Sequence, residues 1–167
     1  VVFKKNCIPS NHAEMAYPVF KKAIGKTSNR GKAGGNFNFK VGDVVDGSVV
    51  GKVLGGNRFI PLKKDGTLSN SPKSKNVNSS IIGYADRYPR IPYCRTTAFS
   101  QKFFNEYNMC VPYIKCIDDV FKNYAPHRYK IQKAMADASS QDFIIKDTAF
   151  TTVTVNKNFR TAAHKDA

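Results

Sequence analysis

Residues 150–166 carry the pattern of side chains that most restricts how this chain can fold. They read FTTVTVNKNFRTAAHKD, and the odd-numbered Val153, Val155 and Phe159 are apolar. Such alternation has the period of two of a β-strand, and its β-branched residues suit a half-buried sheet surface. The polar face, expected to line a pocket, continues in register toward His164 and Asp166. Its even-numbered members are Thr152, Thr154, Asn156, Asn158 and Arg160.

His164 and Asp166 form an H-x-D pair. Residues two apart on an extended backbone project to the same side, so the imidazole and the carboxylate can bind one cation while Lys165 points away. Two histidines and one carboxylate hold non-haem Fe(II) and leave positions open for a co-substrate and oxygen. An H-x-D pair also arises by chance in a chain with 3 His and 12 acidic residues, so the pair alone does not establish a metal site.

Several helices are predicted between residues 11 and 138. The first covers about residues 11–24 and either starts near Tyr17, with Pro18 in its first turn, or is kinked at Pro18. Ser100 is expected to cap a helix that reaches about residue 107. Apolar spacings of three and four then predict helices over 111–124, with Pro112 in the first turn, and 128–138. The adjacent Asp118 and Asp119 are interpreted as solvated helix surface.

Short strands are expected over 37–62, 81–84 and 143–146, with a longer strand from residue 148 onward. Helices followed by strands, without alternation of strand and helix, indicate an α+β fold in which helices buttress a mostly antiparallel sheet.

Residues 1–80 are interpreted as a basic N-terminal region with short strands and mobile loops. Residues 25–36 form a Gly-rich basic loop, and Ala33 stands where a phosphate-binding loop needs Ser or Thr. Residues 63–80 are polar and predict a surface loop. Residues 1–75 hold 14 basic and 4 acidic residues, a net charge of +10 of the total +15. This charge favours contact with nucleic acid or an anionic membrane surface, and it is also compatible with a role in solubility alone.

The four cysteines, Cys7, Cys94, Cys110 and Cys116, show no C-x-x-C spacing and follow no secretory segment. We therefore expect reduced, mostly packed thiols in a cytoplasmic protein, in the host cytoplasm if the source is viral. No apolar run is long enough to span a bilayer, so no membrane association is expected.

Residues 86–99, DRYPRIPYCRTTAF, interleave basic and planar side chains. Such a segment can hold phosphates and stack on a base. It is equally interpreted as a Pro-stiffened loop whose aromatic side chains pack on the core.

The runs IIGYADRYPRIPYCRTTAF and FTTVTVNKNFRTAAHKD together resemble the ten-eleven-translocation and J-binding-protein family of Fe(II)/2-oxoglutarate dioxygenases, most closely its phage-type branch. The resemblance covers residues 81–166 and implies an oxidoreductase with a double-stranded β-helix, a jelly-roll-like fold. It implies hydroxylation of the 5-methyl group of a pyrimidine base in nucleic acid, with DNA as the expected partner. The base would leave the helix stack, or the strand would be single.

Carried over residue by residue, the resemblance implies that His164 and Asp166 are Fe(II) ligands. It also makes Asn158 and Arg160 candidates for binding 2-oxoglutarate, and Arg95 and Thr161 candidates for contacting the substrate. The distal His ligand and the basic 2-oxoglutarate anchor of the family are expected beyond residue 167. Residues 81–167 are thus expected to hold helices and the first strands of the core, truncated after H-x-D and inactive alone.

Two further hypotheses compete with the dioxygenase. In the first, the chain is a non-catalytic basic nucleic-acid-binding module, H-x-D is a chance match, and the aromatic and basic segment binds the polymer. In the second, the chain is a phage-like structural or assembly protein.

Overall fold

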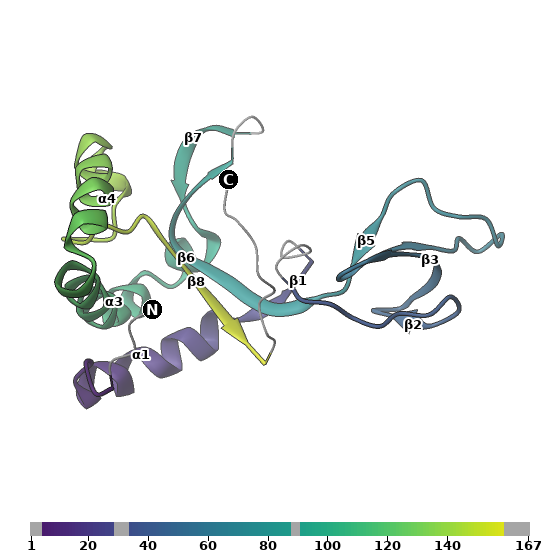
Figure 1. Cartoon of the computed structure of the whole chain (residues 1–167), viewed down its shortest axis with the longest axis horizontal. Coiled ribbons are helices and arrows are strands. Elements are labelled where there is room, and N and C mark those ends of the chain that lie inside the picture. Colours follow the sequence, from purple (N-terminus) through teal and green to yellow (C-terminus); the bar gives the residue numbers. More distant parts are fainter. Residues whose placement is uncertain (1–4, 29–33, 88–90, 159–167) are drawn as a thin grey trace. The chain divides into compact units, whose positions relative to one another are not determined.

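A computed structural model describes residues 5–28, 34–87 and 91–158 (Figure 1). Contacts group the chain into two compact units, which we call the helical unit, Val1–Ala23 with Ile81–Val155, and the small-sheet unit, Ile24–Ser80 with Asn156–Ala167. The first helix of the predicted N-terminal region thus groups with the later helices. Within the described residues, no helix is long and apolar enough to cross a membrane.

The helical unit contains α1 (Ser10–Ala23), α2 (Ala98–Lys102), α3 (Phe104–Tyr124), α4 (Pro126–Ala138) and a 3-10 helix, η1 (Gln141–Phe143). The alternative start near Tyr17 is wrong, because α1 begins at Ser10 and continues through Pro18. The predicted break between residues 107 and 111 is also wrong, since α3 is continuous and Pro112 lies in its interior. The buried faces of Tyr107, Cys110 and Ile114 span the proline, and their packing offsets the missing backbone N–H.

Helix capping also differs from the prediction. Thr97, and not Ser100, occupies the N-cap position of α2. Ser100 is instead fully buried, and its hydroxyl oxygen accepts a hydrogen bond of 2.9 Å from the Gly83 N–H. Serine often begins a helix, but here the Ser100 side chain connects α2 to the strand that contains Gly83.

One antiparallel sheet has the order β1 (Gly25–Thr27), β6 (Val77–Arg87), β7 (Ile91–Thr96), and β8 (Thr152–Lys157) also pairs with β6. In the register of β6 and β7, Tyr84 lies opposite Thr96 and Ala85 opposite Arg95. The loop interpretation of residues 86–99 is therefore wrong for β7. The strand predicted at 143–146 is also wrong, because these residues end η1 and enter a turn.

The small-sheet unit contains β2 (Val44–Val45), β3 (Ser48–Gly55), β4 (Arg58–Pro61) and β5 (Lys73–Ser74), in that order and antiparallel. These strands confirm the prediction for residues 37–62. The loop predicted over 63–80 is wrong in its second part, where β5 and the start of β6 lie. Three side chains form its buried cluster: Val45, Val50 and Phe59.

The core of the helical unit joins helices to strands. Its buried cluster consists of Ala16, Val19, Ile82, Phe99, Tyr107, Cys110, Ile114 and Ile145. Because Ile82 belongs to β6 and most of the others belong to helices, the helices cover one face of the sheet. The predicted combination of helices with antiparallel strands is confirmed.

Candidate functional site

Strand β8 leads toward the H-x-D pair in the sequence, and its apolar positions face the core, whereas the polar face was expected to look inward. Val153 and Val155 are half-buried and pack against the main cluster of the helical unit. On the polar side, Thr154, Asn156 and Asn158 are exposed. The described part of this face therefore opens to solvent and gives no support to the expected pocket.

The polar face nevertheless contacts strand β6. The Thr152 hydroxyl donates to the Tyr84 carbonyl oxygen, and the Tyr84 N–H donates to the Thr151 carbonyl oxygen at 2.8 Å. Further along, the Ser79 hydroxyl donates to the Asn156 side-chain oxygen at 2.7 Å. As residue numbers rise along β8 they fall along β6, so the two strands are antiparallel.

Gly83 permits the close approach of these strands. Its φ of +95° lies in the region that favours glycine, and a Cβ at this position would stand 2.5 Å from the Thr151 carbonyl oxygen. Its carbonyl oxygen accepts from the Thr97 N–H at 2.8 Å. Glycine is thus required where β6 meets the start of β8.

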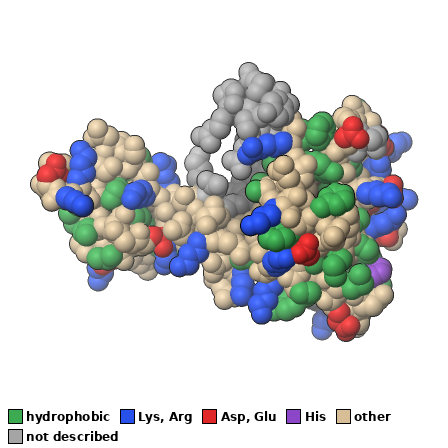
Figure 2. Space-filling model, turned by 180° about the vertical axis from the view of Figure 1, so that it is seen from behind, with side chains coloured by type: hydrophobic (Ala, Val, Ile, Leu, Met, Phe, Trp, Pro, Cys, Tyr) green, Lys and Arg blue, Asp and Glu red, His purple; other side chains and the backbone are tan. Residues whose placement is uncertain are grey.

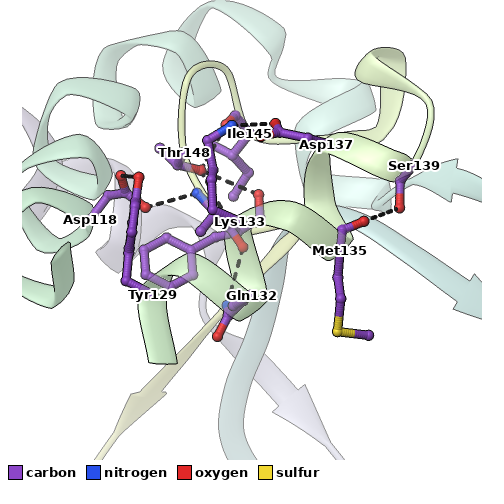
Figure 3. A network of polar contacts seen from close by, with 11 residues as sticks. Asp118, Tyr129, Gln132, Lys133, Met135, Asp137, Ser139, Ile145 and Thr148 are labelled. Atoms are coloured by element: carbon purple, nitrogen blue, oxygen red, sulfur yellow. Dashed lines mark hydrogen bonds and ion pairs between the residues drawn. The ribbon is translucent and has the colours of Figure 1, made fainter. Parts of the chain in front are cut away.

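A pair of helix side chains holds the segment just before β8 (Figure 3). Asp118 of α3 accepts a hydrogen bond of 2.8 Å from the Ala149 N–H, and Gln132 of α4 donates one of 3.1 Å to the Ala149 carbonyl oxygen. Asp118 also accepts from the Tyr129 hydroxyl at 3.0 Å. The prediction that Asp118 is solvated is wrong, because only 3% of it is exposed; it satisfies a backbone N–H that the core hides from water.

The segment held in this way forms a tight turn of its own. The buried Thr148 hydroxyl donates to the Ile145 carbonyl oxygen at 2.7 Å and accepts from the Phe150 N–H at 3.1 Å. The Ile145 N–H in turn donates to the Phe150 carbonyl oxygen at 2.9 Å. The start of β8 is therefore fixed both by hydrogen bonds within residues 145–150 and by side chains of α3 and α4.

A groove of about 590 Å³ borders this segment in the helical unit. Its wall includes Tyr84, the 60% exposed Phe104, and Tyr107. Burial, together with the neighbouring Tyr84, raises the pKa of Tyr107 well above that of an ordinary tyrosine, so this phenol stays protonated. The sequence prediction missed this wall because it ended a helix at residue 107, whereas Phe104, Asn108 and Val111 share one face of the continuous α3.

Most of the site residues predicted from sequence lie outside the described residues: Arg160, Thr161, His164 and Asp166. Of the remaining two, Asn158 is exposed beyond the end of β8 and has a φ of +58°. Arg95 is exposed on β7. Among residues 5–28, 34–87 and 91–158, no group of three His, Cys, Asp or Glu side chains is arranged to hold a metal ion.

A sequence model of a known family, Tet_JBP, the oxygenase domain of the 2OGFeDO superfamily, matches residues 80–167. The chain belongs to this family. The match begins within β6 and includes the H-x-D pair. Membership in this superfamily implies Fe(II) and 2-oxoglutarate as cofactor and co-substrate. Oxidoreductase and dioxygenase chemistry is thereby confirmed at the level of the family.

Three curated relatives are similar to the chain. The bifunctional helicase and thymine dioxygenase JBP2 of Trypanosoma brucei brucei is 33% identical over 95 residues, or 55% of this chain and 8% of the relative. JBP2 of Trypanosoma cruzi is 35% identical over 94 residues, 54% of this chain and 8% of the relative. The thymine dioxygenase JBP1 of Trypanosoma brucei brucei is 37% identical over 93 residues, 53% of this chain and 10% of the relative.

The chain thus spans a tenth or less of the length of these relatives. No solved structure matches it significantly.

Proposed function

We propose that this oxygenase domain takes part in hydroxylating the 5-methyl group of thymine in DNA. The observation that carries the proposal is the family match over residues 80–167, which includes the H-x-D pair. Relatives named thymine dioxygenases, 33% to 37% identical, support thymine as the substrate base. Thymine is characteristic of DNA, and a net charge of +15 favours binding of its phosphates.

Within this proposal, His164 and Asp166 hold Fe(II), an ion that two histidines and a carboxylate suit. A bound Fe(II) would supply the oxygen chemistry that links decarboxylation of 2-oxoglutarate to hydroxylation of the methyl group. Asn158 and Arg160 bind 2-oxoglutarate, whereas Arg95 and Thr161 contact the nucleotide. The base leaves the helix stack to reach the site, unless the strand is single. The double-stranded β-helix and a cytoplasmic location also belong to this proposal.

The described residues contribute by fixing the strand that leads to these ligands. Asp118 and Gln132 hold both backbone polar groups of Ala149, and β6 pairs with β8 beyond it. Ligands that follow a fixed strand keep their geometry better than ligands on an unsupported loop, because less motion remains to be restricted when the metal binds. The hydrogen bonds of Asp118 and Gln132 to Ala149 therefore fix where β8 begins.

The proposal is tested with the protein encoded by the complete open reading frame. Thymine-containing duplex and single-stranded DNA are incubated with Fe(II), 2-oxoglutarate and oxygen, and the digested nucleosides are analysed by mass spectrometry. We expect 5-hydroxymethyluracil, with succinate in matching amounts. DNA that stays unchanged under conditions in which 2-oxoglutarate is consumed would refute thymine as the substrate.

Two single variants test the assignment of the metal ligands, and a third serves as their control. His164→Ala and Asp166→Ala should each abolish product formation and weaken Fe(II) binding measured by calorimetry. Lys165→Ala, between them in the sequence, should keep both, because on an extended backbone a residue between two ligands would project to the opposite side. Full activity of the His164 and Asp166 variants would refute their assignment as ligands.

A further inference from the structure

A groove in the small-sheet unit combines lysines and hydroxyl groups with the apolar Val49, Pro61 and Leu62. It has a volume of about 480 Å³, and Lys63, Lys64, Lys73, Ser48 and Ser69 contribute to its wall. No acidic side chain belongs to this wall in the described part of the chain. Three lysines that line one hollow favour a positive potential there, because charges of one sign in a concave surface reinforce one another.

The backbone around this groove is well braced. Lys63 donates its N–H to the Thr67 carbonyl oxygen at 2.8 Å, and the Gly66 N–H returns to the Lys63 carbonyl oxygen at 3.1 Å. The Lys73 ammonium donates to the Ser48 hydroxyl at 2.9 Å, which joins β5 to β3. The lysines thus project from a tight turn and from a strand, and less backbone freedom is lost when they bind a ligand.

The acidic residues of the same sheet are occupied elsewhere. Asp43 accepts from the Lys40 N–H at 2.8 Å, and Asp46 from the Asn76 N–H at 2.7 Å. Asp65 lies next to Lys64 in the sequence, but it accepts both the N–H and the hydroxyl of Thr67, at 2.9 Å and 2.6 Å. Asp43 and Asp65 therefore stabilise local turns, and Asp46 holds the segment between β5 and β6.

Basic side chains outnumber acidic ones across this sheet. Residues 34–76 hold seven Lys or Arg and three Asp, and Figure 2 shows several of the blue side chains gathered over it. One of them, Lys75, lies over the Phe37 ring at 4.2 Å, and Phe37 stacks on Phe39 with their ring centres 5.7 Å apart. The aromatic pair thus holds a further cation on the same unit.

We propose that the groove of Lys63, Lys64 and Lys73 binds the phosphodiester backbone of DNA. Lysine ammonium groups and serine hydroxyls are the common partners of phosphate oxygens, and they carry no sequence preference. The proposal rests on the proposed function for its choice of DNA, and it gives β3, β5 and the turn after β4 the task of holding the polymer while the residues of the family match act on the base.

The test is the salt dependence of DNA binding by the whole chain. Fluorescence anisotropy with a labelled DNA duplex is measured for the wild type and for Lys63→Gln/Lys64→Gln/Lys73→Gln. If each lysine neutralises one phosphate, the slope of log affinity against log salt falls by about 2.7 in the variant. Between about 50 and 200 mM salt, the wild-type affinity then drops about 40-fold more than that of the variant.

A charge-matched control separates a site from a general field. Lys21→Gln/Lys122→Gln/Lys130→Gln removes the same charge from exposed positions of α1, α3 and α4. The control should keep most of the salt slope, and circular dichroism should show that both variants fold. Equal changes in the two variants, or an unchanged slope in the groove variant, would overturn the proposal.

The last measurement is binding of the wild type and the groove variant to vesicles of anionic lipid. Binding to vesicles that depends on the three groove lysines, without such dependence for DNA, would also overturn the proposal. The measurement needs no iron and no turnover. A protein that binds DNA through the groove but does not hydroxylate thymine would refute the proposed function alone, and hydroxylation that persists without groove binding would refute this inference alone.

Discussion

Replacing Asp118 by alanine should destabilise the helical unit by about 3 kcal/mol. The substitution leaves the Ala149 N–H without its 2.8 Å acceptor in a residue that is 3% exposed, and an unpaired buried donor costs about 1–3 kcal/mol. It also removes the acceptor of the Tyr129 hydroxyl, a hydrogen bond worth about 1 kcal/mol. Because the neighbouring Asp119 is exposed, Asp119→Ala should change stability by less than about 0.5 kcal/mol.

The assay is urea unfolding followed by tyrosine fluorescence. All 8 tyrosines lie outside residues 24–80, and the chain has no tryptophan, so the signal reports on the helical unit. Asp118→Asn retains a carbonyl acceptor for the Ala149 N–H and should lose only about 1 kcal/mol. Equal stability of Asp118→Ala and Asp119→Ala would refute the reasoning that this carboxylate holds the start of β8.

Three further predictions concern single residues of the helical unit: Gly83, Tyr129 and Cys110. Gly83→Ala should cost about 3 kcal/mol of stability through backbone strain and the 2.5 Å approach to the Thr151 oxygen. Gly42 has a similar φ of +93° but open space around it, so Gly42→Ala should cost about 1 kcal/mol. Equal losses of stability, followed by circular dichroism, would contradict this. Desolvation and the hydrogen bond to Asp118 raise the pKa of Tyr129 to about 12. The stability that protonated Tyr129 gives the fold is therefore full below about pH 10 and declines toward pH 12. A difference titration against Tyr129→Phe that shows ionisation near pH 10 would contradict this. Burial raises the pKa of Cys110 to about 11, so iodoacetamide should modify this thiol only after unfolding. Mass spectrometry that shows equal rates of modification in the native and the unfolded protein would count against this.

Local periodicity predicted the elements whose burial follows one face. The alternation at Val153 and Val155 predicted strand β8, and the apolar spacing around Ile114 predicted the second part of α3. The polar side of β8 was expected to look inward, whereas Val153 and Val155 pack on the core. A break after residue 107 was wrongly predicted because Pro112 was expected near a helix start. Tertiary packing on both sides of that proline outweighed its local preference.

Long-range contacts were beyond such reasoning. Asp118 and Gln132 meet Ala149 across 31 and 17 residues of sequence, and a carboxylate on a helix surface gives no local sign that it accepts a distant backbone N–H. The positive φ of Gly83 depends likewise on a strand that lies far along the chain. The family resemblance was recovered because it rests on a short motif, and the assignment of His164, Asp166 and their neighbours stays a prediction.

The unequal size of the two hydrophobic clusters has a consequence for hydrogen exchange. Among the described residues, the helical unit buries eight cluster residues and the small sheet three. Local opening is easier where fewer apolar contacts must be broken, so amides of β3 and β4 should exchange faster than those of α3. A polyanion that binds only the folded sheet would slow this exchange in proportion to its occupancy. Protection of these amides would thus report binding residue by residue, without a label on either partner.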